Sequence, residues 1–484
     1  MLDKNGQSRM TNYRWVICSL LFFATTINYL DRQVLSLTWT DHIVPEFYWT
    51  NSDYGNITSL FSIVYAISML FAGRFVDWLD TKKGFTWAII IWSIGACLHA
   101  FAGIATSGIL TGNWMVGFAG AAEEIKKVSD VALVASTSVT LFIVARIVLA
   151  IGEAGNFPAA IKATAEYFPK KDRGFATSIF NAGATVGALA APLTIPFIAS
   201  AWGWEMAFIV IGALGFVWLG FWLFMYKKPE QHPKVNQTEL DYIQQDYRGS
   251  FEFDQQPTPT PVVKKMPFMQ AFRYRQTWSF ALGKFMTDGV WWFFLFWTPA
   301  YLKAVYGLDS EQSAPQIFVL YAITLLSIIG GWLPTFFVEK KKMNPYAGRM
   351  RAMLIFAFFP LLTLFAQPLG SQSVWLPVII IGIAGAAHQA WSANIFSTVG
   401  DMFPKSAIAT VTGIGGMAGG VGSYLINKGS GVLFDHAKNT NMKLLGFEGI
   451  ESGYFIIFAI CSVAYLIGWL IMKSLVPVYK PISL

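Results

Sequence analysis

The sequence predicts an all-α membrane protein with twelve transmembrane helices in two six-helix bundles, related by a pseudo-twofold repeat. Three observations support this: a shortage of charge, a series of apolar segments of membrane-spanning length, and motifs that recur in both halves. Of the 484 residues, 55% are hydrophobic and 13% are charged, and the mean hydropathy is +0.48. A soluble chain carries roughly 25% charged residues, so the surface of this chain suits lipid better than water.

The apolar segments are long enough to cross a bilayer, which takes about 20 mostly apolar residues. The first run is too long for a cleaved signal peptide, so it is predicted as an uncleaved first helix. The stretch 104–137 contains an apolar piece and then charges around 123–130, and it is predicted as an extended loop or a short extra helix. The predicted spans lie near 15–37, 55–77, 85–105, 138–160, 174–198, 204–226, 277–302, 315–338, 350–368, 374–397, 407–430 and 452–474.

Lysine and arginine collect in alternate loops, which predicts the orientation of the chain. By the positive-inside rule, both termini and the long polar segment 227–276 are expected in the cytoplasm. The net charge of +7 therefore belongs to loops, and no nucleic-acid partner is predicted. The clusters are Lys4/Arg9/Arg14, Arg74/Lys82/Lys83, Lys170/Lys171/Arg173, segment 227–276, Lys340–Lys342 with Arg349/Arg351, and Lys473/Lys480.

The two halves of the chain resemble each other. The tripeptide Phe-Pro-Lys occurs at 168–170 and again at 403–405, each time before a glycine-rich helix. Ala-Thr and two glycines then follow at matching spacings in both halves. A repeat of this kind is typical of transporters whose site lies between two bundles near the membrane midplane. We therefore predict an N-terminal bundle at 1–226, a cytoplasmic linker at 227–276 and a C-terminal bundle at 277–484.

Charged residues inside the predicted spans are the main functional candidates. A charge at a helix centre costs ~2.5–3.5 kcal/mol on the insertion scale, so it is retained only beside water, a partner or a substrate. Asp31 and Arg32 lie in the first span, and Arg146 and Glu153 share one face of the fourth, ~10 Å apart along its axis. The guanidinium groups suit a substrate carboxylate, and Asp31 or Glu153 suits the coupling proton. Alternatively, Asp31–Arg32 and Arg146–Glu153 only neutralise each other.

Three motifs resemble the anion:cation symporter branch of the major facilitator superfamily. These are Asn-Tyr-Leu-Asp-Arg at 28–32, Gly-Glu-Ala-Gly-Asn-Phe-Pro-Ala-Ala at 152–160, and Tyr-Phe-Pro at 167–169 followed by Arg-Gly. The resemblance covers essentially the whole chain and is closest to bacterial hexuronate (glucuronate or galacturonate) transporters, with further support at 180–183, 330–334 and 387–390.

The resemblance implies the major facilitator fold and proton-coupled symport of a sugar acid by alternating access in a bacterial inner membrane. It also implies that Arg32 and Arg146 bind the carboxylate and that Asp31 and Glu153 carry protons. One departure concerns the loop after the second helix. Gly73 and Asp77 fit the superfamily motif there, but Trp78 and Asp80 replace a basic residue and a glycine. The loop therefore departs from the superfamily motif, for which the resemblance implies a gating role.

Further polar residues are candidates for lining a cavity between the halves. The repeat places His388 where Glu153 lies, so a proton role stays open. A neutral, hydrogen-bonded role or substrate binding, by contact with a substrate hydroxyl together with Gln389 and Asn394, is the alternative for His388. Lys284, Asp288 and Trp391 are equally suited to helix–helix contact, and the first two are spaced to pair with each other. The remaining substrate-binding candidates are Tyr29, Tyr65, Asn181, Gln389 and Asn394.

No cofactor, metal site or enzyme activity is predicted. Cys18, Cys97 and Cys461 lie in apolar segments without paired spacing, and no nucleophile elbow or phosphate loop occurs. An embedded enzyme would need converging catalytic groups, of which only His388 is well placed, and a sensor would need a signalling domain. Transport of another organic anion (an aldonate, a dicarboxylate or an aromatic acid) or exchange without protons stays open. We expect a monomer, because two bundles complete a pathway within one chain.

Overall fold

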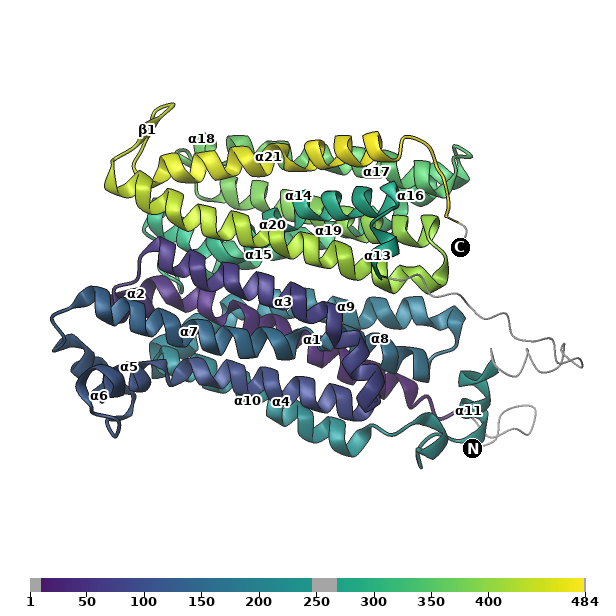
Figure 1. Cartoon of the computed structure of the whole chain (residues 1–484), viewed down its shortest axis with the longest axis horizontal. Helices are drawn as coiled ribbons and strands as arrows, with labels where there is room; N and C mark the ends of the chain where they lie inside the picture. The colour runs from purple at the N-terminus through teal and green to yellow at the C-terminus, as the bar shows by residue number, and fades with distance from the viewer. Residues whose placement is uncertain (1–9, 246–267, 483–484) are drawn as a thin grey trace, which may run out of the picture.

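The computed structural model describes residues 10–245 and 268–482. The long helices of these ranges form twelve rods in two layers, purple to teal and green to yellow in Figure 1. The N-terminal layer consists of α1 (Arg14–Thr38), α3 (Asn51–Leu79), α4 (Thr81–Ala100) with α5 (Ala102–Thr111), α7 (Val131–Glu153) with α8 (Asn156–Tyr167), α9 (Lys170–Trp202) and α10 (Trp204–Met225).

The C-terminal layer repeats this arrangement. It consists of α14 (Arg275–Tyr306), α15 (Ala314–Thr324) with α16 (Ile329–Glu339), α17 (Pro345–Phe358) with α18 (Ala366–Gly370), α19 (Trp375–Met402), α20 (Lys405–Asn439) and α21 (Ile450–Leu475). The repeated Phe-Pro-Lys motif has the same local geometry in both layers, because Pro169 and Pro404 are the N-caps of α9 and α20 with φ, ψ of −63°, 157° and −64°, 151°. The fold class predicted from the sequence is thus confirmed.

Short elements lie at the two ends of the rods. One end, here called the terminal end, holds the start of α1, the end of α21, η2 (Pro229–Gln231), α11 (Gln237–Ile243) and α13 (Phe268–Ala271) (Figure 1). The opposite end, here called the hairpin end, holds η1 (Trp39–Ile43), α2 (Val44–Phe47), α6 (Gly117–Lys126) and the antiparallel pair β1 (Lys443–Leu444) and β2 (Phe447–Glu448).

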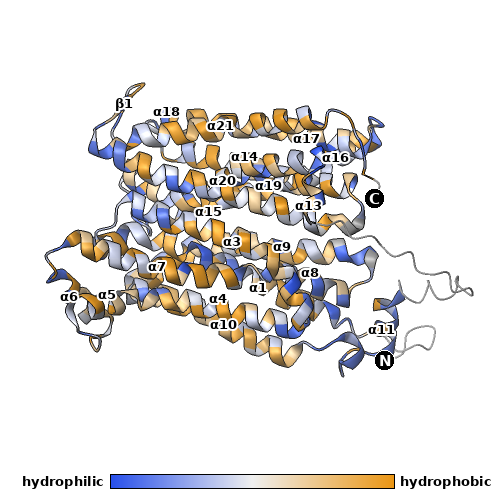
Figure 2. Ribbon diagram, in the orientation of Figure 1, coloured by the Kyte–Doolittle hydropathy of each residue, from blue (hydrophilic) through white to orange (hydrophobic). Residues whose placement is uncertain are grey.

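The helices have the hydropathy of membrane spans. Within the described residues, eight helices are long and apolar enough to cross a membrane, or nine when α4 and α5, bent by 54°, are taken as one span. Figure 2 shows apolar residues along the rods and hydrophilic residues gathered toward their ends. Helices α1, α14 and α20 fall outside this count; α1 and α14 carry ionisable residues in their interiors, and α20 is rich in glycine.

Glycines allow the helices around the site to approach closely. A Cβ atom at Gly152 of α7 would lie 2.2 Å from the backbone nitrogen of Trp92 in α4. One at Gly95 of α4 would lie 2.4 Å from the backbone nitrogen of Leu149 in α7. The rod then breaks between α7 and α8, directly after Glu153. Pro158 falls in the first turn of α8, where a missing N–H breaks no helical bond. Glu153 is therefore buried at the carboxyl end of α7, inside the bundle.

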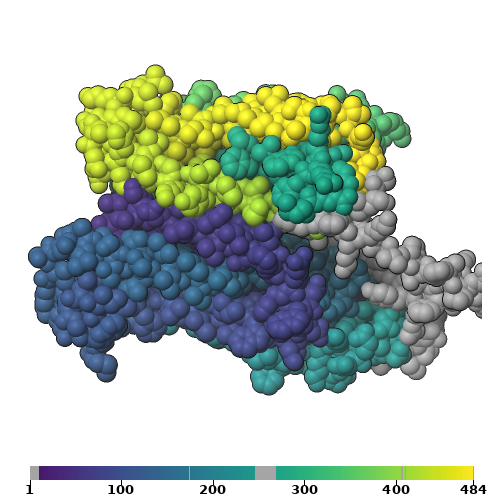
Figure 3. Space-filling view, viewed as in Figure 1, coloured from purple at the N-terminus to yellow at the C-terminus, as the bar shows by residue number. Residues whose placement is uncertain are grey.

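The two layers meet along α3 and α20 (Figure 3). A Cβ atom at Gly420 would lie 2.1 Å from the Ala66 Cβ, and one at Gly431 would lie 2.4 Å from the Asn51 carbonyl oxygen. Two carboxylates close the hairpin end of this seam, and we call them the latch. Asp435 of α20 accepts hydrogen bonds from the backbone nitrogens of Asn51 and Ser52 at 3.0 and 2.6 Å.

The second latch carboxylate belongs to the N-terminal layer. Asp41 accepts a hydrogen bond from the Ser310 nitrogen at 2.7 Å and pairs with Lys303 Nζ at 3.1 Å. Each layer therefore supplies one carboxylate to backbone N–H groups of the other. These bonds join the layers at the hairpin end.

The stretch 104–137 forms α5, α6 and the start of α7, so the short extra helix, rather than the extended loop, is observed. α7 begins at Val131, before the predicted start at 138. Part of the predicted linker is ordered: Glu239 of α11 accepts the Tyr13 and Arg14 nitrogens at 2.8 and 3.0 Å and so caps α1. The linker stretch 246–267, and Lys4 and Arg9 of the first basic cluster, lie outside the described residues.

Candidate functional site

The centre of the site is an ion pair between two helices of the N-terminal layer. Arg32 of α1 donates to Glu153 Oε2 from Nε at 3.0 Å and from Nη2 at 2.6 Å. The two side chains are 4% and 0% exposed. The alternative in which Asp31 neutralises Arg32 and Glu153 neutralises Arg146 is therefore not what the structure shows, because the pair is formed crosswise between α1 and α7.

Four aromatic rings surround the guanidinium of Arg32. Its Cζ lies 5.0 Å from the ring centre of Tyr29, 4.9 Å from Tyr65 and 4.9 Å from Trp292. Phe61 is the fourth, at 5.7 Å. Ring faces attract a desolvated cation, so they stabilise the guanidinium without neutralising its charge. Trp292 belongs to α14, so the C-terminal layer contacts the ion pair directly.

Arg146 is the most unusual residue of the site. It lies on α7 and is 1% exposed, with its Cζ 5.2 Å from the Phe61 ring. In the described part of the chain, none of its three side-chain nitrogens has a hydrogen-bond partner. Glu153, Arg32 and Asp31 are close enough for their charges to act on it. A guanidinium carries five N–H donors, and burying them unpaired is costly. The site therefore has an unfilled requirement for an acceptor, preferably an anion.

Further buried polar atoms of the N-terminal layer also lack partners within the described residues. Trp92 Nε1 donates to Asp31 Oδ2, while Asp31 Oδ1 and Glu153 Oε1 have no partner among the described residues. The same holds for both amide atoms of Asn156, a fully buried residue in the first turn of α8. Such atoms in a membrane interior are expected to face water or a ligand.

The hairpin side of the charged cluster is closed by aromatic residues. Trp39 stacks on Tyr54 with centroids 4.1 Å apart and an interplanar angle of 1°. The Tyr54 hydroxyl donates to the Phe296 carbonyl at 2.8 Å, and Trp297 Nε1 donates to Asn427 Oδ1 at 3.0 Å. Of these contacts, the hydrogen bond from Tyr54 to Phe296 joins the two layers, and the Tyr54 ring also meets the Trp297 ring edge-on at 5.0 Å.

The candidates of the C-terminal layer have more complete hydrogen bonding. His388 Nδ1 lies 2.7 Å from the Tyr465 hydroxyl, and the His388 ring stacks on Trp291 at 5.4 Å and 3°. The Asn394 amide nitrogen donates to the Gly330 and Ala390 carbonyls, both at 2.8 Å, and so ties α19 to α16. Gln389 is half-buried on α19.

The structure gathers six of the predicted residues into one cluster: Tyr29, Asp31, Arg32, Tyr65, Arg146 and Glu153. Asn181 is exposed on α9, two residues from Gly183, whose backbone packs against α1. It therefore lies on the face of α9 turned away from that contact. His388, Gln389 and Asn394 have no described contact with the cluster. Their roles in substrate binding stay predictions.

Sequence reasoning did not select Trp92, Asn156, Trp292 or the pair Trp39–Tyr54. Asn156 carried a signal, since a short polar residue stands there inside an apolar segment next to Pro158. The tryptophans carried none. In a chain with 19 tryptophans, one that contacts a buried charge looks like one that faces lipid.

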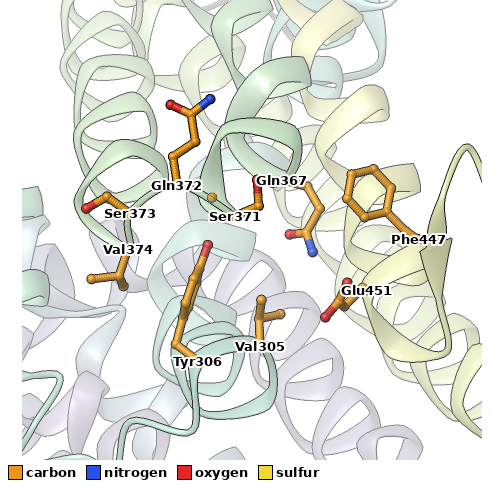
Figure 4. A pocket seen from close by; sticks show the side chains of 10 residues that line it. Val305, Tyr306, Gln367, Ser371, Gln372, Ser373, Val374, Phe447 and Glu451 are labelled. Carbon is orange, nitrogen blue, oxygen red and sulfur yellow. The ribbon is translucent and has the colours of Figure 1, made fainter.

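Two pockets lie away from this cluster, at the hairpin end. One, of about 380 Å³, lies within the C-terminal layer beside β2 and contains Tyr306, Gln367, Phe447 and Glu451 (Figure 4). The other, of about 350 Å³, lies between the layers at the latch and includes Asp435. Neither includes a residue of the charged cluster. Among residues 10–245 and 268–482, no group of three or more His, Cys, Asp or Glu is arranged to hold a metal ion, and the three cysteines are free.

Comparison with known proteins places this geometry in a family. A sequence model of the Major Facilitator Superfamily matches residues 21–124 and 128–426. The hexuronate transporter of Escherichia coli (strain K12) is 28% identical over 473 residues, which cover 96% of this chain and 94% of that one. The galacturonate transporter of Dickeya chrysanthemi is 27% identical over 346 residues, which cover 70% of this chain and 87% of the other.

Solved structures share the fold. The crystal structure of a D-xylose–proton symporter superposes with a TM-score of 0.68 at 16% identity, covering 98% of this chain and 100% of the other. The curated relatives and this structural neighbour are transporters, so the protein is a transporter rather than an enzyme. With two six-helix layers and a family match over most of its length, the chain belongs to the Major Facilitator Superfamily.

Proposed function

We propose that this transporter moves a hexuronate-like sugar acid together with protons, by alternating access. The observation that carries the proposal is the buried guanidinium of Arg146, which has no hydrogen-bond partner among residues 10–245 and 268–482 and lies near the Arg32–Glu153 ion pair. The named relatives that transport hexuronates and galacturonate support the substrate class.

The substrate carboxylate is proposed to bridge Arg146 and Arg32. A carboxylate accepts two N–H donors from a guanidinium, and Arg146 has all of its donors available. Arg32 now gives two hydrogen bonds to one oxygen of Glu153, so the incoming carboxylate competes with Glu153 for the same donors. A buried carboxylate without a cationic partner is costly. In this proposal Glu153 therefore takes up a proton when substrate binds.

Asp31 is proposed as the second proton carrier. Its Oδ2 is held by Trp92, while Oδ1 has no partner in the described part of the chain. Each net charge moved inward carries ~2.3 kcal/mol per 100 mV of membrane potential. A monoanion with one proton is neutral and gains nothing from the potential, so accumulation driven by the potential needs more than one proton. Two neighbouring carboxylates make that stoichiometry possible.

Alternating access is proposed to be a rocking of the bundle at 1–226 against the bundle at 277–484, with 227–276 as the linker between them. The latch and the contacts of Tyr54 with Phe296 and Trp297 then separate when the hairpin end opens. The terminal end, with its basic clusters, is proposed to face the cytoplasm of a bacterial inner membrane. One chain is proposed to act as a monomer, because both bundles contribute to a single site.

The test is uptake of radiolabelled glucuronate and galacturonate into proteoliposomes, with and without an inward proton gradient. We expect accumulation that requires the gradient. In Glu153→Gln, which keeps the shape of the side chain but cannot ionise, we expect accumulation to disappear while exchange of labelled for unlabelled substrate continues.

The matched control is Lys443→Gln, which removes an exposed ion pair on the hairpin and should leave uptake unchanged. Wild-type accumulation that persists after full collapse of the proton gradient would contradict proton coupling. Absence of uptake by folded wild-type protein would reject the hexuronate assignment and direct the search to aldonates, dicarboxylates and aromatic acids.

A further inference from the structure

The C-terminal layer contains a buried ion pair that is not part of the charged cluster. Lys284 Nζ lies 2.7 Å from Asp288 Oδ2 on α14, and the two side chains are 6% and 14% exposed. Removing two charges from water costs more than their attraction commonly returns, and apolar residues of similar size serve packing at least as well. Inside a membrane span such a pair is by default a functional candidate.

The position of the pair connects it to Arg32, where the substrate carboxylate is proposed to bind. Lys284, Asp288 and Trp292 are spaced by four residues and lie along one face of α14. Trp292 is the residue whose ring lies under the guanidinium of Arg32. Because Nζ of Lys284 reaches Asp288, the charged atoms of the pair lie at the level of Asp288, one helical turn or ~6 Å from Trp292. That separation is comparable to the length of a six-carbon sugar acid.

The surroundings hold the pair in place. Lys284 Nζ lies 4.3 Å from the centre of the Phe396 ring of α19. A Cβ atom at Gly419 of α20 would lie 2.2 Å from Asp288 Oδ2, so the carboxylate rests on the backbone of that helix. The next residue, Gly420, packs against Ala66 of the N-terminal layer. The pair is thus fixed beside the seam between the layers, where a substrate bound to Arg32 and Arg146 would extend.

We infer that Lys284 and Asp288 form a distal subsite that binds two neighbouring hydroxyl groups of a monoanionic sugar acid. The inference rests on the proposed function and specifies its substrate. An ammonium donates and a carboxylate accepts, which satisfies both faces of a vicinal diol. The pair has no net charge, so it suits a neutral polar group. A second substrate carboxylate at this position would meet Asp288, and like charges brought together are strongly disfavoured.

The experiment compares uptake of glucuronate, a monoanion, with uptake of glucarate, a dianion of the same carbon skeleton. In wild-type protein we expect a higher kcat/KM for glucuronate. Asp288→Asn leaves Lys284 as an unpaired cation, so the glucarate-to-glucuronate ratio of kcat/KM should rise by about tenfold. Lys284→Gln leaves an unpaired carboxylate, so both substrates should be transported more slowly and glucarate should lose more.

The exposed hairpin pair serves as the control, because Lys443→Gln and Glu448→Gln remove the same two charge types without altering the site. Their substrate ratios should equal that of the wild type. Equal loss of both substrates in Asp288→Asn and Lys284→Gln, in protein that elutes as a single folded species, would overturn the subsite and assign the pair to packing. A wild-type preference for glucarate would also overturn it. No wild-type uptake of either acid would instead reject the proposed function.

Discussion

The interiors of the two layers differ in how completely their buried charged groups are paired. The N-terminal layer buries Asp31, Arg32, Arg146 and Glu153, and in the described residues three of these four have side-chain atoms without a hydrogen-bond partner. The C-terminal layer buries a complete ion pair, Lys284–Asp288, and a histidine bonded to Tyr465. Unpaired buried groups are costly unless a ligand or proton completes them. In the proposed mechanism the N-terminal charges therefore exchange partners when the substrate carboxylate binds, whereas the Lys284–Asp288 pair stays formed.

Removing the unpaired guanidinium of Arg146 tests the difference between the layers most directly. Arg146→Ala should lower kcat/KM for glucuronate by about 100-fold or more. The substitution removes one partner of the proposed charge pair between Arg146 and the substrate carboxylate, and truncating one partner of a buried charge pair costs roughly 2–5 kcal/mol. Arg146→Lys keeps the charge but loses the planar fork, so it should recover only part of the activity. Initial uptake rates in proteoliposomes give both values.

Arg351→Gln is the control for that substitution. Arg351 is an exposed arginine of α17, outside the cluster, and its loss should leave uptake unchanged. If Arg146→Ala keeps wild-type kcat/KM, the unpaired guanidinium does not bind the substrate, and the contrast between the layers loses its functional meaning.

A further carboxyl group of the N-terminal layer, that of Glu46, lies outside the membrane-spanning segments. Burial raises the pKa of Glu46, on α2, from 4.5 to about 7, although Trp204 Nε1 donates to its Oε2 at 2.8 Å. The folded state therefore binds a proton more tightly than the unfolded state does. The bound proton therefore stabilises the folded state fully below pH 4.5, and this stabilisation is lost as the pH rises through 7. The free energy of unfolding should fall by a total of ~2 kcal/mol over this range, once partial exposure of the side chain is allowed for.

Glu46→Gln should abolish that loss, so the difference in thermal unfolding temperature between pH 5.5 and pH 8.5 should shrink relative to the wild type. Scans at one fixed heating rate in detergent measure it. Glu448→Gln, on the exposed hairpin, should keep the wild-type difference. An equal decline with pH in Glu46→Gln and wild type would show that another group is responsible.

The latch tests whether a fully paired carboxylate of the C-terminal layer controls opening. Asp435 accepts hydrogen bonds from the first turn of α3, at Asn51 and Ser52, where a negative charge also favours the helix N-terminus. Asp435→Asn keeps the size but removes the charge, which should weaken the closed hairpin end by ~1–2 kcal/mol. A cysteine placed at Ala304, which lines the pocket at the latch, should then react about tenfold faster with a membrane-impermeant maleimide.

Asp401→Asn is a matched control at the opposite end, because Asp401 pairs with Arg349 within the C-terminal layer. It should leave the labelling rate at Ala304→Cys unchanged. A similar rate for Asp435→Asn and wild type would mean that the glycine contacts of α3 and α20, rather than the latch, hold the hairpin end closed.

The sequence was sufficient for the fold because spans, breaks and repeats follow from local rules. Apolar segments of the required length predict the rods, and the repeated Phe-Pro-Lys motif predicts equivalent starts for α9 and α20. The sequence also singles out the four intramembrane charges, as two pairs on two helices, and the structure brings them together; their role in transport stays a prediction. Their cost in lipid identifies them without any knowledge of the packing.

What could not be predicted was the pairing. Arg32 lies beside Asp31 in sequence but bonds to Glu153, because close approach of α4 and α7 at Gly95 and Gly152 places Trp92 on Asp31 instead. Contacts across the layers, such as Arg32 with Trp292, depend on how two distant helices meet. Helical periodicity determines which residues share a face but not which face of another helix they contact.

The smallest expected effect concerns His388, for which sequence analysis left a proton role and a neutral role open. Its Nδ1 lies 2.7 Å from the Tyr465 hydroxyl and its ring stacks on Trp291, so its partners are supplied by its own layer. His388→Gln should therefore lower kcat/KM by less than about fivefold, as expected for ~1 kcal/mol of lost hydrogen bonding. The pH profile of gradient-driven uptake should keep its shape. Glu153→Gln, measured in parallel, should lose gradient-driven accumulation altogether. Loss of gradient dependence in His388→Gln would assign proton transfer to both layers and remove the distinction between them.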